Sequence, residues 1–228
     1  MNSISQNWPI LRDRIEQAAH SAGRASDDIE VIAVSKTRTA QEVEAAHRCG
    51  LTLVGENRVQ EAEGKKAQVA APLSWHMIGH LQSNKANKAV QLFDVVQSVD
   101  RVSLAQALDR RAHAIGRQIE VMLQVNTADS ASQSGAHPDQ VVELAGRVAE
   151  LPSLEICGLM TIGAHSDDEH TVRASFARLR GLGESVDADI EKVSIRHLSM
   201  GMSGDFEWAI AEGSTMLRLG TALFGARA

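Results

Sequence analysis

The chain has 228 residues, of which 43% are hydrophobic and 23% charged, a composition typical of a folded globular protein with one substantial core. Its formal net charge of −6 argues against the broad basic surface that nucleic-acid binding requires, so no nucleic-acid partner is expected. The opening residues lack the apolar core of a signal peptide and no segment is apolar enough to span a membrane, so we expect a cytoplasmic protein without a membrane partner.

Strand-like and helix-like segments alternate along the chain after an amphipathic stretch at 4–22 that carries Trp8, Leu11 and Ile15 at helical spacing. Strands are predicted at 31–35, 51–55, 74–79, 95–99, 120–125, 155–162, 197–200 and 216–220. Helices are predicted at 40–49, 58–70, 84–92, 102–115, 138–150, 168–186 and 205–212. This alternation predicts an α/β fold, a single (β/α)8 TIM barrel with an extra N-terminal helix, in one domain over residues 1–228. An open doubly wound sheet is the alternative.

Lys36 stands at the carboxyl end of the first predicted strand, before a helix that opens with a capping box from Thr39 to Glu42 and ends at Gly50. In α/β folds the carboxyl ends of parallel strands face the ligand. A primary amine held there can attack a carbonyl group and form a Schiff base. Alternatively, the ammonium group extends from the strand end into water, and this segment by itself favours that second interpretation.

The loops after the last two predicted strands indicate a phosphate site, because many barrels bind phosphate where backbone N–H groups converge at this place. Hydroxyl groups and bare amides are available there from Ser199, Gly201, Ser203, Gly220 and Thr221. Asp205 and Glu207 open the following helix and would repel a phosphate unless they point away. Ser203 is alternatively only the N-cap of that helix.

Arg218 lies in a short apolar strand, where an inward-pointing guanidinium needs an acceptor such as a cofactor ring nitrogen or a buried carboxylate. His76 and His80 flank a strand-like segment without a carboxylate ligand, and Cys49 and Cys157 have no ligand spacing, so no metal is expected. The two thiols are expected to be buried or half-buried. Lysines on the predicted helices are interpreted as solvated surface, with contact to a phosphate as the alternative: Lys65, Lys66, Lys85 and Lys88.

Several segments form a pattern when they are taken together. They are AVSKT at 33–37, GENRVQE at 55–61, WHMIGHLQSNK at 75–85, GLMT at 158–161, LSMGMS at 198–203 and GSTMLRLG at 213–220. They occur in one order over almost the whole chain, and the set is specific although each motif alone is not. In this combination the chain resembles the YggS/PROSC family, the pyridoxal 5′-phosphate homeostasis proteins.

The resemblance implies a fold-type III barrel like the amino-terminal domain of alanine racemases, holding pyridoxal 5′-phosphate as a Schiff base on Lys36. It implies that Arg218 faces the pyridine nitrogen, with Asn57 and His76 near the cofactor. The residues implied around the phosphate are Ser199, Gly201, Ser203, Gly220 and Thr221. The family's implied role is to bind and buffer the cofactor and to hand it to acceptor enzymes, without turnover.

The chain departs from the family pattern in two places where some members carry lysines. Gln133 occupies a loop in which some members have a lysine, and the sequence ends at Ala226-Arg227-Ala228 where others have a lysine-bearing tail. A second contact with pyridoxal phosphate that depends on those lysines is therefore not supported by this sequence.

Racemisation requires one acid/base group on each face of the substrate. Alanine racemases use the cofactor lysine and a tyrosine from a second domain, whereas this sequence contains no tyrosine and leaves no residues for such a domain. We therefore expect a non-catalytic, monomeric carrier of pyridoxal phosphate. The alternatives are a small pyridoxal-phosphate-dependent amino-acid racemase with another second base, and a cofactor-free aldolase-like barrel that uses Lys36 directly on a sugar phosphate.

Overall fold

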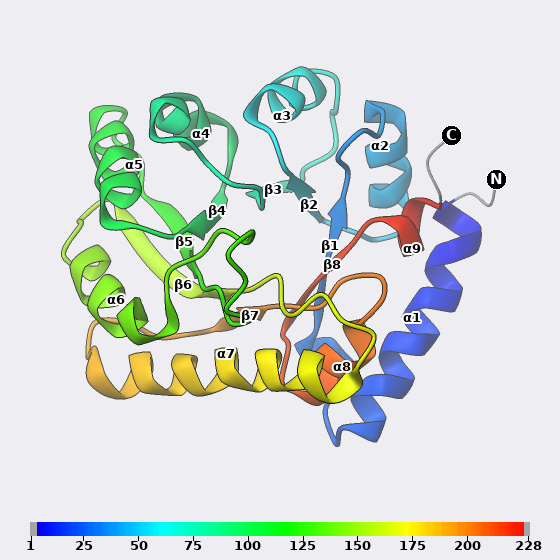
Figure 1. The fold of residues 1–228 in the computed structure, drawn as a ribbon. Helices are drawn as coiled ribbons and strands as arrows, with labels where there is room; N and C mark the ends of the chain where they lie inside the picture. The colour runs from blue at the N-terminus through cyan, green and yellow to red at the C-terminus, as the bar shows by residue number, and fades with distance from the viewer. Residues whose placement is uncertain (1–3, 226–228) are drawn as a thin grey trace.

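A computed structural model of the chain describes residues 4–225. Eight parallel strands follow one another around a closed barrel, and the last strand pairs with the first (Figure 1). The strands are β1 Glu30–Val34, β2 Leu53–Glu56, β3 Ser74–Met77, β4 Val95–Val99, β5 Ile119–Gln124, β6 Leu154–Met160, β7 His197–Ser199 and β8 Met216–Leu219. The predicted barrel is confirmed, and the open doubly wound sheet is excluded.

Helices surround the barrel at nearly the predicted positions (Figure 1). The α-helices are α1 Ile4–Ser21, α2 Ala40–Arg48, α3 Val59–Lys66, α4 Ala86–Leu92, α5 Val102–Ala114, α6 Val141–Ala149, α7 Glu169–Asp189, α8 Phe206–Ala211 and α9 Thr221–Phe224. Short 3₁₀ turns occur at η1 Ser26–Asp28, η2 Ser83–Lys85 and η3 Pro138–Gln140. Within residues 4–225, no helix combines the length and apolar character needed to cross a bilayer.

The predicted boundaries of α2 are confirmed in atomic detail. The Thr39 hydroxyl accepts a hydrogen bond from the Glu42 N–H at 3.2 Å, and the Glu42 carboxylate accepts one from the Thr39 N–H at 2.7 Å. This capping box satisfies backbone donors that a helix start leaves free. Gly50 follows the helix with φ +89°, a conformation that favours glycine. These signals fix the short turn between β1 and α2 in which Lys36 lies.

The additional helix α1 covers the outside of the barrel where the chain closes. The helix after β8, α9, has only four residues, and α1 lies beside both α8 and α9 (Figure 1). Leu11, Ile15 and Ala19 of α1 are buried, and the Asn7 amide donates to the Leu223 carbonyl at 3.0 Å. Helix α1 therefore takes the place that a full-length helix after β8 would occupy.

The core has two parts, one between strands and helices and one inside the barrel. The inner cluster is apolar and consists of Ile32, Val34, Val95, Met122, Cys157, Met160 and Met216. Cys157 is buried, and its burial raises the pKa of the thiol to about 12, whereas Cys49 is half-buried. The expectation for the two thiols is confirmed. The apolar inner cluster shares the barrel with buried polar side chains, which are described below.

Candidate functional site

The carboxyl ends of the strands surround a pocket of about 430 Å³, within the size range of small-molecule sites. Its lining brings together predicted site residues from both ends of the chain: Lys36, Asn57, Ser203, Arg218, Gly220 and Thr221. The apolar part of the lining is Val34, Ile78, Met160, Ile162 and Met202. The other three predicted residues, His76, Ser199 and Gly201, are buried and do not line this pocket.

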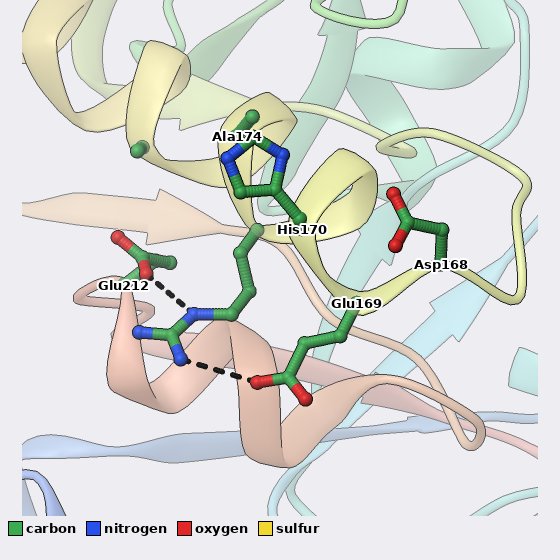
Figure 2. A pocket seen from close by; sticks show the side chains of 7 residues that line it. Asp168, Glu169, His170, Ala174 and Glu212 are labelled. Atoms are coloured by element: carbon green, nitrogen blue, oxygen red, sulfur yellow. Dashed lines mark hydrogen bonds and ion pairs between the residues drawn. The ribbon is translucent and has the colours of Figure 1, made fainter.

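A larger cavity of about 580 Å³ is an open groove at the start of α7, and none of the predicted site residues lines it (Figure 2). Arg173 occupies this groove between two carboxylates, with Nε 2.8 Å from Glu212 and NH1 3.2 Å from Glu169. The guanidinium in the groove is therefore already paired with two carboxylates. The pocket at the strand ends is the better candidate because its amine and guanidinium form no ion pair with a carboxylate of residues 4–225.

Lys36 lies in a tight turn that neighbouring side chains hold. The Arg38 N–H donates to the Ser35 carbonyl at 2.9 Å, and Thr37 has φ +65°, a left-handed conformation that costs a β-branched residue about 1–2 kcal/mol. The Glu61 carboxylate accepts a hydrogen bond from the Thr37 N–H at 3.1 Å, which stabilises the strained turn. Lys36 itself is half-buried, and its amine makes no hydrogen bond or ion pair with any of residues 4–225.

A buried ion pair lies directly behind this turn. Glu56 ends β2 with 0% exposure, and its Oε1 is 2.6 Å from Lys65 Nζ and 2.5 Å from the Ser35 hydroxyl that donates to it. Lys65 Nζ also donates to the Ser35 carbonyl at 2.5 Å, and the Lys65 side chain is only 11% exposed. The interpretation of Lys65 as solvated helix surface is therefore wrong, because the helix turns this side chain under the Lys36 loop.

Arg218 points into the barrel and is 6% exposed. Its NH1 donates to the Ser199 hydroxyl at 2.8 Å, and its NH2 donates to the Thr161 carbonyl at 2.6 Å. Burial lowers the pKa of Arg218 to about 10, and the charge of Asp205 opposes this shift, so the side chain stays a cation at neutral pH. Since a guanidinium carries five N–H donors, others remain for a ligand in the pocket.

The loops after β7 and β8 meet at the pocket. The Ala222 N–H donates to the Ser203 hydroxyl at 3.1 Å, so Ser203 joins the two loops. It does not cap α8, whose N-cap residue is Asp205. Four pocket-lining backbone N–H groups have no hydrogen-bond partner among residues 4–225: those of Ser203, Gly204, Gly220 and Thr221. A group rich in acceptor oxygens, such as a phosphate, matches four converging donors.

The two acids at the start of α8 do not line the pocket. Asp205 accepts a hydrogen bond from the Met202 N–H at 2.5 Å, and burial raises the pKa of its carboxyl group. Glu207 accepts from Arg14 Nε on α1 at 3.0 Å. The repulsion that these acids would exert on a phosphate is therefore reduced, because one binds its own loop and the other pairs with α1.

Asn57 follows β2 and lines the pocket with a buried side-chain oxygen that has no hydrogen-bond partner among residues 4–225. A buried acceptor of this kind normally has a partner, so it indicates a place for a donor from a ligand. Gly79, after β3, packs against the backbone of Asn57, where an added Cβ would lie 2.3 Å from the Asn57 carbonyl oxygen. Glycine at this position therefore lets the two loops approach closely enough to fix Asn57.

His76 is 3% exposed inside the barrel. Its Nδ1 lies 2.9 Å from Gln97 Nε2, and its Nε2 lies 3.2 Å from the Ser74 hydroxyl. Burial is the largest cause that lowers the pKa of His76 to about 4, with Asp94 opposing the shift and His197 adding to it. The imidazole is therefore neutral at physiological pH.

The neutral His76 predicts a pH-dependent stability. Because its pKa is 6.5 in the unfolded chain and about 4 in the folded one, the unfolded state binds more protons between these values. The stability contribution is therefore complete above pH 6.5 and falls by about 3 kcal/mol as the pH drops to 4. Denaturant unfolding of the wild type and of His76→Gln across this range measures it. Equal pH profiles would contradict a neutral, buried His76.

Sequence reasoning missed the roles of Lys65, Glu61 and Gln97. Gln97 is 0% exposed in β4, and its signal is a pair of polar residues, Gln97 and Ser98, between the valines of the segment at 95–99. Lys65 and Glu61 lie four residues apart on α3, which looks like an ordinary surface ion pair. Gln133, where some relatives were expected to carry a lysine, donates its amide to the Gly163 carbonyl at 3.0 Å. The tail at 226–228 lies outside the described residues.

Comparisons with known proteins place the chain in a family. The family model for the N-terminal domain of alanine racemase matches residues 7–228. A pyridoxal phosphate homeostasis protein of Pseudomonas aeruginosa is 44% identical over 228 residues, which cover 100% of this chain and 97% of the relative. The structure of PipY of Synechococcus elongatus with PLP bound matches with a TM-score of 0.83 at 37% identity, covering 93% of this chain and 100% of PipY.

An alanine racemase of Clostridium difficile shares the fold at a TM-score of 0.79 and 14% identity, and the match covers 99% of this chain but 60% of the racemase. The close relatives that match over nearly their full length carry the homeostasis name rather than the racemase name. The chain therefore belongs to the alanine racemase N-terminal domain family and, within it, to the pyridoxal phosphate homeostasis proteins.

Proposed function

We propose that this protein binds pyridoxal 5′-phosphate, holds it as a Schiff base on Lys36, and buffers or delivers it in the cytoplasm as a monomeric carrier. The bound cofactor would supply an aldehyde that condenses with amines. The observation that carries the proposal is the pocket at the strand ends, which combines a free amine with hydrogen-bond donors for a phosphate. PipY, 37% identical to this chain, has been solved with PLP bound, which supports the choice of cofactor.

The residues of the pocket fit the cofactor group by group. The unpaired N–H groups at 203–204 and 220–221, with the hydroxyls of Ser203 and Thr221, would bind the phosphate. Arg218 has only donors, so its free N–H groups would bind a ring nitrogen that acts as acceptor. The orphan oxygen of Asn57 would accept from a further donor. Lys36, which has no other partner among the described residues, would attach the aldehyde.

A carrier explains the pocket better than a racemase does. Lys36 and Arg218 are the only acidic or basic side chains in its described lining, and Arg218 remains protonated at neutral pH. A second acid/base group, which racemisation requires on the opposite face, is therefore missing from this lining. The sequence also has no tyrosine to take that role. Ile162 and Met202, each 37% exposed, flank a pocket open enough for exchange with amines or with acceptor enzymes.

The Lys36→Ala variant tests the attachment. After soaking in pyridoxal phosphate, the wild type is expected to show the absorbance of a protein-bound Schiff base at the boundary between the near-ultraviolet and visible ranges. Lys36→Ala is expected to lose this absorbance and to keep its thermal unfolding midpoint, because the Lys36 amine makes no hydrogen bond or ion pair within residues 4–225. Lys88→Ala, which removes an exposed lysine paired with Glu63, is the matched control and should keep the absorbance.

Three results would contradict this account. If Lys36→Ala unfolds, Lys36 is structural, and if it keeps the absorbance, another amine holds the cofactor. A wild type that stays colourless after soaking favours the aldolase-like alternative.

Incubation with a panel of amino acids in deuterated water separates carrier from racemase. The carrier is expected to show no sustained exchange of the Cα hydrogen, and sustained exchange at enzymic rates would establish the racemase.

A further inference from the structure

A chain of hydrogen bonds crosses the barrel interior from the pocket to its far wall. Arg218 NH1 donates to the Ser199 hydroxyl at 2.8 Å, and that hydroxyl donates to Gln97 Oε1 at 2.8 Å. Gln97 Nε2 lies 2.9 Å from His76 Nδ1, and the other ring nitrogen of His76 lies 3.2 Å from the Ser74 hydroxyl. Arg218, Ser199, Gln97 and His76 come from β8, β7, β4 and β3, and none is more than 6% exposed.

The direction of every bond follows from the donors and acceptors available. A guanidinium can only donate hydrogen bonds, so the Ser199 hydroxyl must accept from Arg218. The O–H of Ser199 then remains free to donate one hydrogen bond. The side-chain carbonyl oxygen of Gln97 accepts the hydrogen bond from Ser199, so the NH₂ group of Gln97 faces His76. The NH₂ group can only donate, so His76 Nδ1 must be unprotonated, as a neutral, buried imidazole allows. Gln97 Nε2 has a second acceptor, Met216 Sδ at 3.2 Å.

This arrangement explains how a cation stays buried without a carboxylate in contact. Among residues 4–225, Arg218 donates to one hydroxyl and one backbone carbonyl. The Thr161 carbonyl is fixed by the backbone, whereas a hydroxyl can rotate and present either a lone pair or a proton. The Ser199 hydroxyl therefore keeps a lone pair on Arg218 only while its own O–H donates to another acceptor. Gln97 is that acceptor.

We propose that Gln97 is a positioning residue for Arg218: the Gln97 amide fixes the Ser199 hydroxyl as an acceptor and so aligns the guanidinium with the ring nitrogen of the bound cofactor. This inference rests on the proposed binding of pyridoxal phosphate. It also gives His76 and Ser199 a role that acts through Arg218 rather than through contact with the cofactor. Gln97 does not line the pocket and has no hydrogen bond to Lys36, so its effect is expected on one part of the ligand only.

The test compares two ligands on several variants. The ligands are pyridoxal 5′-phosphate and its deaza analogue, in which a carbon replaces the pyridine nitrogen. Gln97→Met keeps the length of the side chain and removes both hydrogen-bonding ends. It is expected to bind pyridoxal phosphate about five- to tenfold more weakly than the wild type, the effect of misaligning a charged hydrogen bond. Its affinity for the deaza analogue, which has no ring acceptor, should stay within about twofold of the wild-type value.

Two further variants separate positioning from general loss of packing. Gln97→Glu in its protonated form has the same pattern as glutamine, because its carbonyl accepts from Ser199 and its hydroxyl donates to His76. It is therefore expected to restore affinity for pyridoxal phosphate to within about twofold of the wild type. Gln124→Met is the matched control, because Gln124 is another buried glutamine in the barrel wall but binds the Ser134 carbonyl instead. It should change neither affinity.

Ser199→Ala completes the design. If Gln97 acts through Ser199, the same selective loss appears in Ser199→Ala, and adding Gln97→Met to it causes no further loss. If Gln97→Met does not fold, Ser199→Ala alone tests the same series of hydrogen bonds. Equal weakening of both ligands, or no weakening of either, overturns the positioning role and leaves the proposed function standing. A wild type that binds neither ligand contradicts the proposed function itself.

Discussion

Replacing Lys65 by methionine is expected to lower the free energy of unfolding by about 3–5 kcal/mol, although Lys65 lies on an outer helix. The substitution leaves the Glu56 carboxylate, which is 0% exposed, without its cation at 2.6 Å. It also removes the donor to the Ser35 carbonyl in the turn before Lys36. A buried charge that loses its partner is costly because the protein cannot solvate it as water does. Denaturant unfolding at neutral pH measures the difference.

The double variant Glu56→Gln with Lys65→Met is the critical comparison. Removing both charges is expected to recover at least half of the lost stability, since the desolvation penalty disappears with the carboxylate. Lys88→Met is the matched control: its ion pair with Glu63 is about half exposed on both sides, so the loss should stay within about 1 kcal/mol. If Lys65→Met costs no more than Lys88→Met, the ion pair behind the Lys36 turn has no structural importance.

Replacing Arg218 by methionine is expected to weaken the binding of pyridoxal phosphate by about 10- to 100-fold, the range for loss of a charged hydrogen bond in a buried site. Methionine fills a similar space but donates no hydrogen bond, so Ser199 and the Thr161 carbonyl lose a partner, as would the ring nitrogen that we propose Arg218 binds. Arg218→Lys keeps the charge but not the planar fork that reaches both acceptors, so it should recover affinity only in part. Titration followed by absorbance gives both affinities.

Thermal unfolding of the same variants shows whether lost affinity reflects lost folding. The guanidinium is 6% exposed, so both substitutions are expected to lower the unfolding midpoint as well. An unchanged affinity in a folded Arg218→Met protein would remove Arg218 from the site.

The fold was predictable because strong local signals agree with the global pattern. The strand–helix alternation, the capping box at Thr39 and the glycine at position 50 all mark boundaries that the structure confirms. Helix α9, with four residues, was not predicted, because it is shorter than the period that a helical pattern needs. The role of α1 in covering the barrel beside α8 and α9 was not predictable either, because it depends on how the chain ends meet in space.

The residues that line the pocket were largely predictable from the sequence, whereas the residues that hold them in place were not. Lys36 directly follows the first strand and Arg218 lies in the last one, so the barrel order alone places both near the same mouth. Lys65 of α3 and Gln97 of β4 act through Glu56 of β2 and Ser199 of β7, and these pairings depend on which side chains turn toward one another in the fold. The sequence predicts His76 and Ser199 near the cofactor, whereas neither lines the pocket: Ser199 accepts from Arg218, and His76 lies beside Gln97 inside the barrel.

The most direct measurement is to incubate the protein with pyridoxal phosphate, reduce it with borohydride and locate the adduct by peptide mass spectrometry. The account predicts one stable label, on the peptide that carries Lys36, and none on the peptides of Lys65 or Lys88. A label on a different side chain, or an unlabelled protein, would contradict the central claim that the amine after β1 holds the cofactor.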